Sequence, residues 1–363
     1  MLKYLDEFRS DKVAAYYIKQ INEHMPSFPV ALMEICGGHT LTIVKYGLQA
    51  LLPEGLRLIS GPGCPVCVTP QGYIDAAIEL SRQPDMIITS FGDMLRVPGS
   101  TSSLYKEKAT GADIRVCLSS LDALEIAAVN PRKQVVFLGI GFETTAPTVA
   151  YAVKAAARDG VKNFSVLSAL KTIPNAMQVL LTGGELNLQG FICPGHVSAI
   201  TGTDMYEKIV QDFKVPCVVS GFEPTDMLEA VGMTVAQLKD GRAEVDNQYK
   251  RSVKGPGNRH ALEVIDEIFV SADTEWRGLG VIPGSGLSIR EAFAAHDAAR
   301  KFPLTLQPAR EHPGCICGAV MRGVKLPTDC GLFGTVCTPY NPVGACMVSA
   351  EGSCGIYYKY AKK

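Results

Sequence analysis

Short apolar runs rich in β-branched residues alternate with longer helical patterns along most of this chain, and this alternation constrains the fold most. Helical patterns occupy residues 73–83, 121–130, 148–160 and 226–241. The apolar runs lie at 31–38, 86–93, 114–120, 135–141, 164–170, 191–196 and 217–222. Buried strands that alternate with helices build parallel sheets from βαβ units. The sequence therefore predicts an α/β protein with parallel sheets.

The run of elements is long enough for two similar α/β domains. Strand ends followed by a Gly-Phe pair or its equivalent recur in both halves (SFGD, GIGFETT, SGFEP), which favours a division near 145–165. The first 25 residues have the apolar spacing of an amphipathic helix. After residue 300 a Pro-containing linker leads into a segment dense in Gly, Pro and Cys. We therefore predict four parts: a helical segment 1–30, α/β domains 31–150 and 151–300, and a cysteine-rich domain 301–363.

Composition narrows the functional classes. The formal net charge is −1 and no run of like charges occurs, so a basic face for nucleic acid or an anionic membrane is not indicated. Neither a secretory apolar region nor a membrane-spanning window is found, and we expect a cytoplasmic protein without nucleic-acid or membrane partners. Twelve cysteines are many for such a protein. In a reducing compartment, clustered cysteines bind metal or perform redox chemistry.

Six cysteines lie in the C-terminal segment, which has too little apolar surface to order itself and should be held by a metal. They are Cys315, Cys317, Cys330, Cys337, Cys346 and Cys354. Zinc and a [4Fe–4S] cluster both accept four thiolates, and thiols without metal are a third interpretation. The long, irregular gaps favour the cluster over zinc. A single residue separates Cys315 from Cys317, which makes joint ligation of one metal awkward.

Two motifs near the N-terminus also bear chemistry. In GPGCPVC, Cys64 and Cys67 form a CxxC pair after a strand-like run, which is typical of a redox dithiol, half a metal site or chance. In EICGGHT, Cys36 ends a strand and His39 follows three residues later. This pair is either a nucleophile with its base, two ligands for a transition metal, or a buried Cys beside a core His. Ligands of α/β sheets bind outside the carboxyl ends of the strands, where both motifs fall.

Other motifs admit several roles. His196 in PGHVSAITG, at a strand end, suits catalysis, ligand contact or a loop hydrogen bond, and SFGDMLRVPGS similarly presents Asp93 and Arg96. EWRGLG (275–280) contains the only Trp and an Arg that could meet an anion, but such a segment is more often a packed loop. GIGFETTAP lacks GxGxxG and a Walker lysine, so nucleotide binding is unsupported. The cysteines expected to pack as small hydrophobes are Cys117, Cys193 and Cys217.

Together, these motifs resemble the HypD family of hydrogenase maturation factors, in the same order over essentially the whole chain. The matching segments are CGGHT, GPGCPVC, SFGDMLRVPGS, GFETTAPT, PGHVSAITGT, GFEP, EWRGLG and the terminal cysteines. The resemblance implies two α/β domains plus a small cysteine-rich domain with a [4Fe–4S] cluster. The family's cluster pattern, Cys-x12-Cys-x6-Cys-x16-Cys, is similar here at Cys317, Cys330, Cys337 and Cys354. Cys315 and Cys346 are left as extras.

The resemblance also implies partners and a cargo. The family works with the small chaperone HypC as a scaffold on which Fe(CN)2CO is assembled for [NiFe]-hydrogenase. HypE delivers cyanide as a thiocyanate on its C-terminal cysteine, and HypF would act through HypE. By resemblance, Cys36 holds the iron with a HypC cysteine, His39 lies beside it, and Cys64 and Cys67 form a redox dithiol nearby. Asp93, Arg96 and His196 are supporting candidates.

These expectations define a metallocofactor assembly scaffold with redox capability rather than a turnover enzyme. We expect electrons to enter at the cluster, pass through the CxxC pair and support ligand transfer to iron at Cys36. One alternative is a ferredoxin-dependent disulfide reductase that uses the same cluster and CxxC pair. Another alternative is an α/β binding protein whose cysteine-rich segment is held together by zinc. A radical-SAM enzyme is disfavoured because the Cx3Cx2C spacing is missing.

Overall fold

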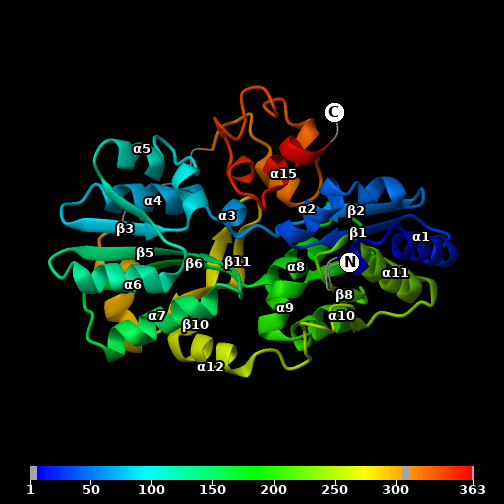
Figure 1. The fold of residues 1–363 in the computed structure, drawn as a ribbon, viewed down its shortest axis with the longest axis horizontal. Helices are drawn as coiled ribbons and strands as arrows, with labels where there is room; N and C mark the ends of the chain where they lie inside the picture. Colours follow the sequence, from blue (N-terminus) through cyan, green and yellow to red (C-terminus); the bar gives the residue numbers. More distant parts are fainter. Residues whose placement is uncertain (1–5, 305–310, 362–363) are drawn as a thin grey trace.

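The computed structural model describes residues 6–304 and 311–361, which form two parallel sheets and an antiparallel hairpin (Figure 1). The first sheet contains β1 (Val30–Glu34), β2 (Leu56–Ser60), β7 (Gly190–Pro194), β8 (Cys217–Ser220) and β9 (Val245–Asn247). The second sheet contains β3 (Met86–Ser90), β4 (Asp113–Val116), β5 (Gln134–Gly141) and β6 (Phe164–Leu170). The hairpin pairs β10 (Phe269–Trp276) with β11 (Gly280–Ile289). The predicted α/β class with parallel sheets is confirmed.

Helices follow most strands. The first group is α1 (Asp11–His24), α2 (Gly37–Lys45), α3 (Pro65–Val68), α4 (Gln71–Ser81), α5 (Leu104–Ala109), α6 (Ser120–Val129), α7 (Ala146–Arg158) and α8 (Ile173–Thr182). The second is α9 (Gly195–Thr201), α10 (Glu207–Phe213), α11 (Pro224–Lys239), α12 (Arg259–Ile268), α13 (Ala298–Lys301), α14 (Cys317–Met321) and α15 (Ser353–Tyr360). None of the helices in the described ranges is both long and apolar enough to cross a membrane.

The strands follow from the apolar runs because they are buried on both faces. All five residues of β3 are buried, and only the first residue of β5 is not. Each of the seven predicted runs contains a strand that lies within one or two residues of the expected start. The N-terminal helix is shorter than predicted: α1 packs on α11 and buries Ile21, and residues 1–5 lie outside the described residues.

The order of strands within the sheets differs from the predicted division at 150. That position falls inside α7, and the strands on either side of it, β5 and β6, pair along their whole length. The first sheet instead joins the early strands β1 and β2 to the late strands β7, β8 and β9 in the order β2-β1-β7-β8-β9. The second sheet, β4-β3-β5-β6, is inserted between them in sequence. The physical reason is that a crossover connection sets the direction of the next strand but not its neighbour in the sheet.

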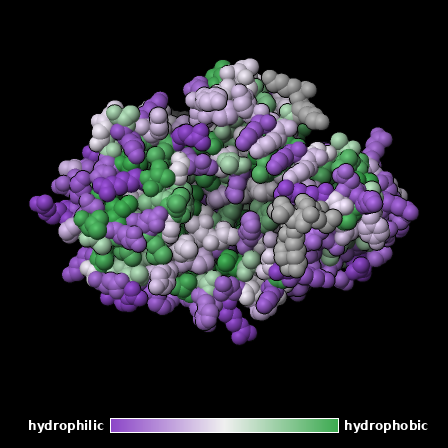
Figure 2. Space-filling view, viewed as in Figure 1, coloured by the Kyte–Doolittle hydropathy of each residue, from purple (hydrophilic) through white to green (hydrophobic). Residues whose placement is uncertain are grey.

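The terminal cysteine segment, residues 311–361, lies above the junction of the two sheets in Figure 1, coloured orange to red. It holds only short helices, as its composition indicated. Its last helix α15 packs on α2, and the 3-10 turn η7 (Ala345–Met347) packs on α3. Residues 305–310 of the predicted linker lie outside the described residues. In Figure 2, apolar residues gather over the half of this face formed by the second sheet, whereas the opposite end is mostly hydrophilic.

Candidate functional site

The carboxyl end of the first sheet carries most of the predicted site. Cys36 follows β1, Cys64 follows β2, His196 begins α9 after β7, and Phe222 follows β8. The strands β2, β1, β7 and β8 are neighbours in the sheet, so motifs far apart in sequence meet at one edge. This is the placement expected for ligands of an open parallel sheet.

Cys36 lies at the N-terminus of α2 in an extended conformation, and its carbonyl accepts hydrogen bonds from the N–H groups of His39 and Thr40. The chain of the GPGC loop runs directly beneath it: Gly37 N donates to Gly63 O at 3.1 Å. A Cβ at Gly63 would overlap the Cys36 backbone, and a Cβ at Gly37 would overlap Glu351 of the terminal cysteine segment. The glycines therefore permit three segments to meet at one thiol.

The surroundings of the Cys36 sulfur favour its neutral form. Burial raises the pKa of the Cys36 thiol to about 12, and the charges of Glu351 and Glu34 act in the same direction. Hydrogen bonds from Gly38 and His39 oppose this, but they are weaker. Without a cation the sulfur keeps its proton at neutral pH. A metal ion that binds here must displace that proton.

Glu34 is a site residue that the sequence reasoning did not identify. It is 1% exposed at the end of β1, and its carboxyl group accepts hydrogen bonds from Cys36 N at 2.9 Å and from the Thr40 hydroxyl. Burial raises the pKa of Glu34 to about 8, against the lowering effect of these donors. The signal was present in the sequence, since a lone acidic residue interrupts an otherwise apolar strand.

His39 is fully buried beside Cys36, and its imidazole is neutral because burial lowers its pKa to about 4. Its Nε2 lies 3.3 Å from Ser220 O, so Nε2 carries the proton and donates it. Its Nδ1 is buried with no hydrogen-bond partner among the described residues. The residue thus presents an unused lone pair, which a metal or a proton can take. His196 stands apart from it, since the Phe222 ring stacks on His196 at 3.9 Å and meets His39 at 4.9 Å.

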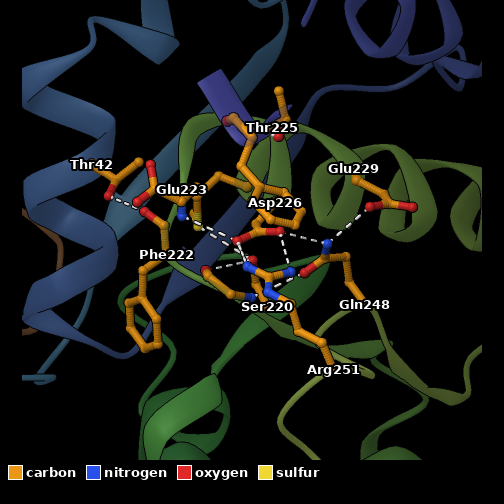
Figure 3. Close-up of polar contacts among 12 residues, drawn as sticks. Thr42, Ser220, Phe222, Glu223, Thr225, Asp226, Glu229, Gln248 and Arg251 are labelled. Carbon is orange, nitrogen blue, oxygen red and sulfur yellow. Dashed lines mark hydrogen bonds and ion pairs between the residues drawn. The ribbon is translucent and has the colours of Figure 1, made fainter. Parts of the chain in front are cut away.

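A polar network holds the Phe222 loop in place (Figure 3). Arg251 makes two hydrogen bonds to the carboxylate of Asp226, which is 1% exposed, and Glu223 N also donates to that carboxylate. Gln248 bridges this carboxylate to Gly221 N. Thr42 of α2 donates to Phe222 O at 2.5 Å. The sequence analysis missed this network because its residues lie on separate elements, with no shared motif.

Cys64 and Cys67 form a disulfide that spans the first turn of α3. Both are buried, and Cys67 N donates to Cys64 Sγ at 3.2 Å. A small cavity joins this pair to the Cys36 loop and to the terminal cysteine segment. It is lined by Gly37, Thr40, Gly61, Pro62, Gly63, Cys64, Cys67, Met321, Cys346, Glu351 and Ser353. The CxxC pair and the loop that follows Cys36 therefore border the same cavity.

The terminal cysteines gather around a second small cavity. Five of them line it: Cys315, Cys317, Cys330, Cys337 and Cys354. The sixth, Cys346, lines the cavity shared with the disulfide and hydrogen-bonds to Cys317 and Cys354. Hydrogen bonds from Cys317 and Cys346 lower the pKa of Cys354, as in a thiolate. Within residues 6–304 and 311–361, no three His, Cys, Asp or Glu side chains converge on a single metal-ion position.

Asp93 and Arg96 contact the terminal cysteine segment rather than Cys36. Arg96 donates to Val348 O at 3.2 Å and to Pro339 O at 3.4 Å, while Ala350 N donates to Asp93 at 3.3 Å. These residues dock the segment against the second sheet. Cys117, Cys193 and Cys217 are buried in apolar clusters, as predicted.

Comparisons with known proteins agree with the motif order. A family model for HypD, described as the hydrogenase formation hypA family, matches residues 12–361. The chain is 48% identical to hydrogenase maturation factor HypD of Azotobacter vinelandii over 370 residues, covering 100% of this chain and 98% of that protein. The corresponding protein of Rhizobium leguminosarum bv. viciae is 47% identical over 370 residues, with 99% and 96% covered. That of Escherichia coli K12 is 42% identical over 369 residues, with 100% and 99% covered.

The family model spans nearly the whole chain, and the relatives are similar along their entire length. The resemblance drawn from the motifs is thereby confirmed. This chain belongs to the HypD family of hydrogenase maturation factors.

Proposed function

We propose that this hydrogenase maturation protein is the scaffold on which an iron ion receives its cyanide and CO ligands, with Cys36 as the protein ligand of that iron. The observation that carries the proposal is the meeting of three segments at Cys36. The CGGHT loop, the GPGC loop and Glu351 of the terminal cysteine segment approach so closely that only glycine fits at positions 37 and 63. A HypC-type chaperone would supply a second thiolate, and a HypE-type protein would deliver cyanide.

The chain's own groups suit the capture of an iron cargo. The thiol of Cys36 keeps its proton until a cation arrives, because its pKa is raised to about 12. Binding of Fe(II) would then release one proton, and soft thiolates suit an iron that carries strong-field ligands. Glu34 holds the backbone of Cys36 from below, and the free Nδ1 of His39 is available to accept a proton or a ligand hydrogen bond.

The donor set of the terminal cysteine segment fits a [4Fe–4S] cluster. Cys317, Cys330, Cys337 and Cys354 line one cavity, and hydrogen bonds from Cys317 and Cys346 lower the pKa of the Cys354 thiol. A tetrahedral zinc site needs four sulfurs that converge on one ion, whereas a cubane takes one thiolate on each of four irons at separate corners. Cysteines from separate turns around one cavity suit a cubane, and the long, irregular gaps between them in the sequence favour it over zinc. When bound, the cluster supplies single electrons.

A shared cavity supports the proposal that the disulfide passes electrons toward Cys36. Cys64 and Cys67 share a cavity with Gly37 on one side and with Cys346 on the other. Reduction of the disulfide takes two electrons and leaves a dithiol. The reductive release of cyanide from a thiocyanate sulfur consumes the same number of electrons. The presence of this disulfide beside clustered cysteines also favours the second candidate, a ferredoxin-dependent disulfide reductase.

Infrared spectroscopy separates the two candidates. The chain, purified anaerobically with its HypC-type partner, should show bands of iron-bound cyanide and CO that disappear in Cys36→Ala. Cys117→Ala serves as the matched control, since Cys117 is buried in a separate apolar cluster and should leave the bands unchanged. A disulfide reductase needs no iron at Cys36. Diatomic-ligand bands that persist without Cys36 would refute the scaffold.

A further inference from the structure

Arg277 lies at the tip of the β10–β11 hairpin, where the chain reverses through Gly278. In Figure 1 this hairpin reaches up to α3 at the centre of the molecule. The backbone of Arg277 donates to Val68 O at 2.8 Å, and its Nε donates to Thr69 O at 3.0 Å. Val68 and Thr69 are the two residues that follow Cys67. The guanidinium group is therefore fixed to the end of the disulfide helix.

The guanidinium of Arg277 is buried, and its positive charge and hydrogen-bond donors are only partly paired. Only 4% of the side chain is exposed, and its Nη2 has no hydrogen-bond partner among the described residues. Within residues 6–304 and 311–361, its carboxylate contact is Glu311, at 3.4 Å from Nη1, and the side chain of Glu311 is itself 41% exposed. An arginine remains protonated in proteins, and a buried charge is costly unless an opposite charge lies close by. Among the described residues, the half-exposed carboxylate of Glu311 is therefore a weak counter-charge for this buried guanidinium.

Arg277 binds the last turn of the one-turn helix whose start carries the disulfide, and reduction of that disulfide would place a negative charge within this short helix. The Cys64–Cys67 bond takes up two electrons and one proton, leaving one thiol and one thiolate. Cys67 N already donates to Cys64 Sγ at 3.2 Å, so a backbone N–H supports negative charge on that sulfur. A nearby cation stabilises a thiolate and makes the disulfide a stronger oxidant, because the reduced form gains most.

We infer that Arg277 is the counter-charge of the Cys64–Cys67 pair and sets its reduction potential. Arg277 thus acts through the disulfide as a positioning residue and does not touch the iron cargo. The biological role of this reduction potential rests on the proposed function, in which the Cys64–Cys67 pair passes electrons. The equilibrium itself belongs to this chain alone, so its measurement does not depend on the scaffold.

The test is a redox titration of the purified chain. Anaerobic samples are equilibrated in mixtures of reduced and oxidised dithiothreitol, which supplies the two electrons and closes to its own cyclic disulfide. After alkylation, the tryptic peptide 58–82 reports the pair cleanly, because Cys64 and Cys67 are its only cysteines. Arg277→Gln should lower the equilibrium constant for reduction about tenfold, equivalent to about 30 mV. Arg277→Lys retains the charge and should stay within about threefold of the parent.

Two further variants guard the interpretation. Arg322→Gln is the matched control: Arg322 also holds the hairpin tip, through Gly278 O at 2.7 Å, but it pairs with Glu185 and has no hydrogen bond to α3. It should leave the equilibrium unchanged. Glu311→Gln removes the competing carboxylate from an exposed position and should favour reduction by roughly two- to threefold.

The opposite signs expected for Arg277→Gln and Glu311→Gln make the inference easy to refute. Equal effects of Gln and Lys at position 277 would assign Arg277 a packing role. So would a shift in Arg322→Gln as large as that in Arg277→Gln. Circular dichroism checks whether Arg277→Gln folds. If it does not, an unchanged equilibrium constant for disulfide reduction in Glu311→Gln overturns the inference. The scaffold proposal would survive each of these outcomes, because it depends on iron ligands at Cys36.

Discussion

The buried carboxyl group of Glu34 should make the stability of this protein fall as pH rises. Its pKa is raised from the ordinary value of 4.5 to about 8 because the side chain is buried beneath the Cys36 loop. In the unfolded chain the group ionises near pH 4.5, whereas in the folded protein it holds its proton until about pH 8. The folded state is therefore unaffected below pH 4.5, loses stability between pH 4.5 and 8, and changes no further above.

The magnitude follows from proton linkage. Each tenfold change in proton affinity is worth about 1.4 kcal/mol, so the full penalty is roughly 5 kcal/mol. Between pH 5 and pH 9 the group should cost about 4 kcal/mol of unfolding free energy. Glu34→Gln removes the titration and keeps an acceptor for Cys36 N, which lies 2.9 Å from the carboxyl group. The variant should therefore gain about 4 kcal/mol relative to the parent between pH 5 and pH 9.

Urea denaturation followed by circular dichroism at several pH values measures this difference. Subtracting the two profiles cancels all other titrating groups. Glu107→Gln is a control of opposite sign, since hydrogen bonds from Arg82 lower the pKa of Glu107 to about 2. It should lose stability relative to the parent as pH rises from about 2 to 4.5, and the difference should stay constant between pH 5 and pH 9. Parallel profiles for Glu34→Gln and the parent would show that Glu34 is solvated in the folded protein, and the reasoning about its burial would fail.

Three further changes test the site. Gly63→Ala should abolish native packing of the Cys36 loop and its iron binding, because the new Cβ overlaps the Cys36 backbone; Gly255→Ala, in open space, should melt like the parent. Cys330→Ser should lose the brown colour and the iron of the proposed cluster, whereas Cys346→Ser should retain both by iron analysis; the reverse result would displace the family's ligand pattern. Arg96→Ala should raise hydrogen exchange in residues 339–350 and cost about 1 kcal/mol, as two partly exposed hydrogen bonds are lost. Unchanged exchange there would mean that Arg96 does not dock the segment.

Local patterns in the sequence were sufficient to predict most strands of the two parallel sheets. Continuous apolar runs identify strands buried on both faces, and the residues that follow them fall at one edge of the sheet. That is why the Cys36 and Cys64 motifs could be expected at the carboxyl ends of strands, whereas their meeting with His196, which we expected in the other α/β domain, was not predicted. The hairpin β10–β11 was not predicted because the exposed polar residues Ser271, Asp273 and Glu275 leave β10 without the continuous apolar run that identified the other strands.

Pairing between distant elements could not be predicted. A βαβ pattern does not specify that β1 pairs with β7, which lies across the whole second sheet in sequence. The Asp226–Arg251 contact is of the same kind, since either residue alone is an ordinary surface charge in the sequence. Glu34 was within reach of sequence reasoning, because a charge inside an apolar strand always requires a partner. The sequence indicated the motif with Asp93 and Arg96, but only the fold shows that these residues form hydrogen bonds with the terminal cysteine segment.

The insertion of the second sheet between β2 and β7 has a consequence for biosynthesis. Strands β3 to β6 can pair as soon as residue 170 has left the ribosome. The first sheet must wait for β7, β8 and β9, which end at Asn247. At 5–20 residues per second, the Cys36 and Cys64 loops would remain without their neighbouring strands for about 10–40 s after synthesis. The nascent chain thus exposes the thiols of Cys36, Cys64 and Cys67 before their loops are complete, and a chaperone that covers them early would protect these thiols until the first sheet has formed.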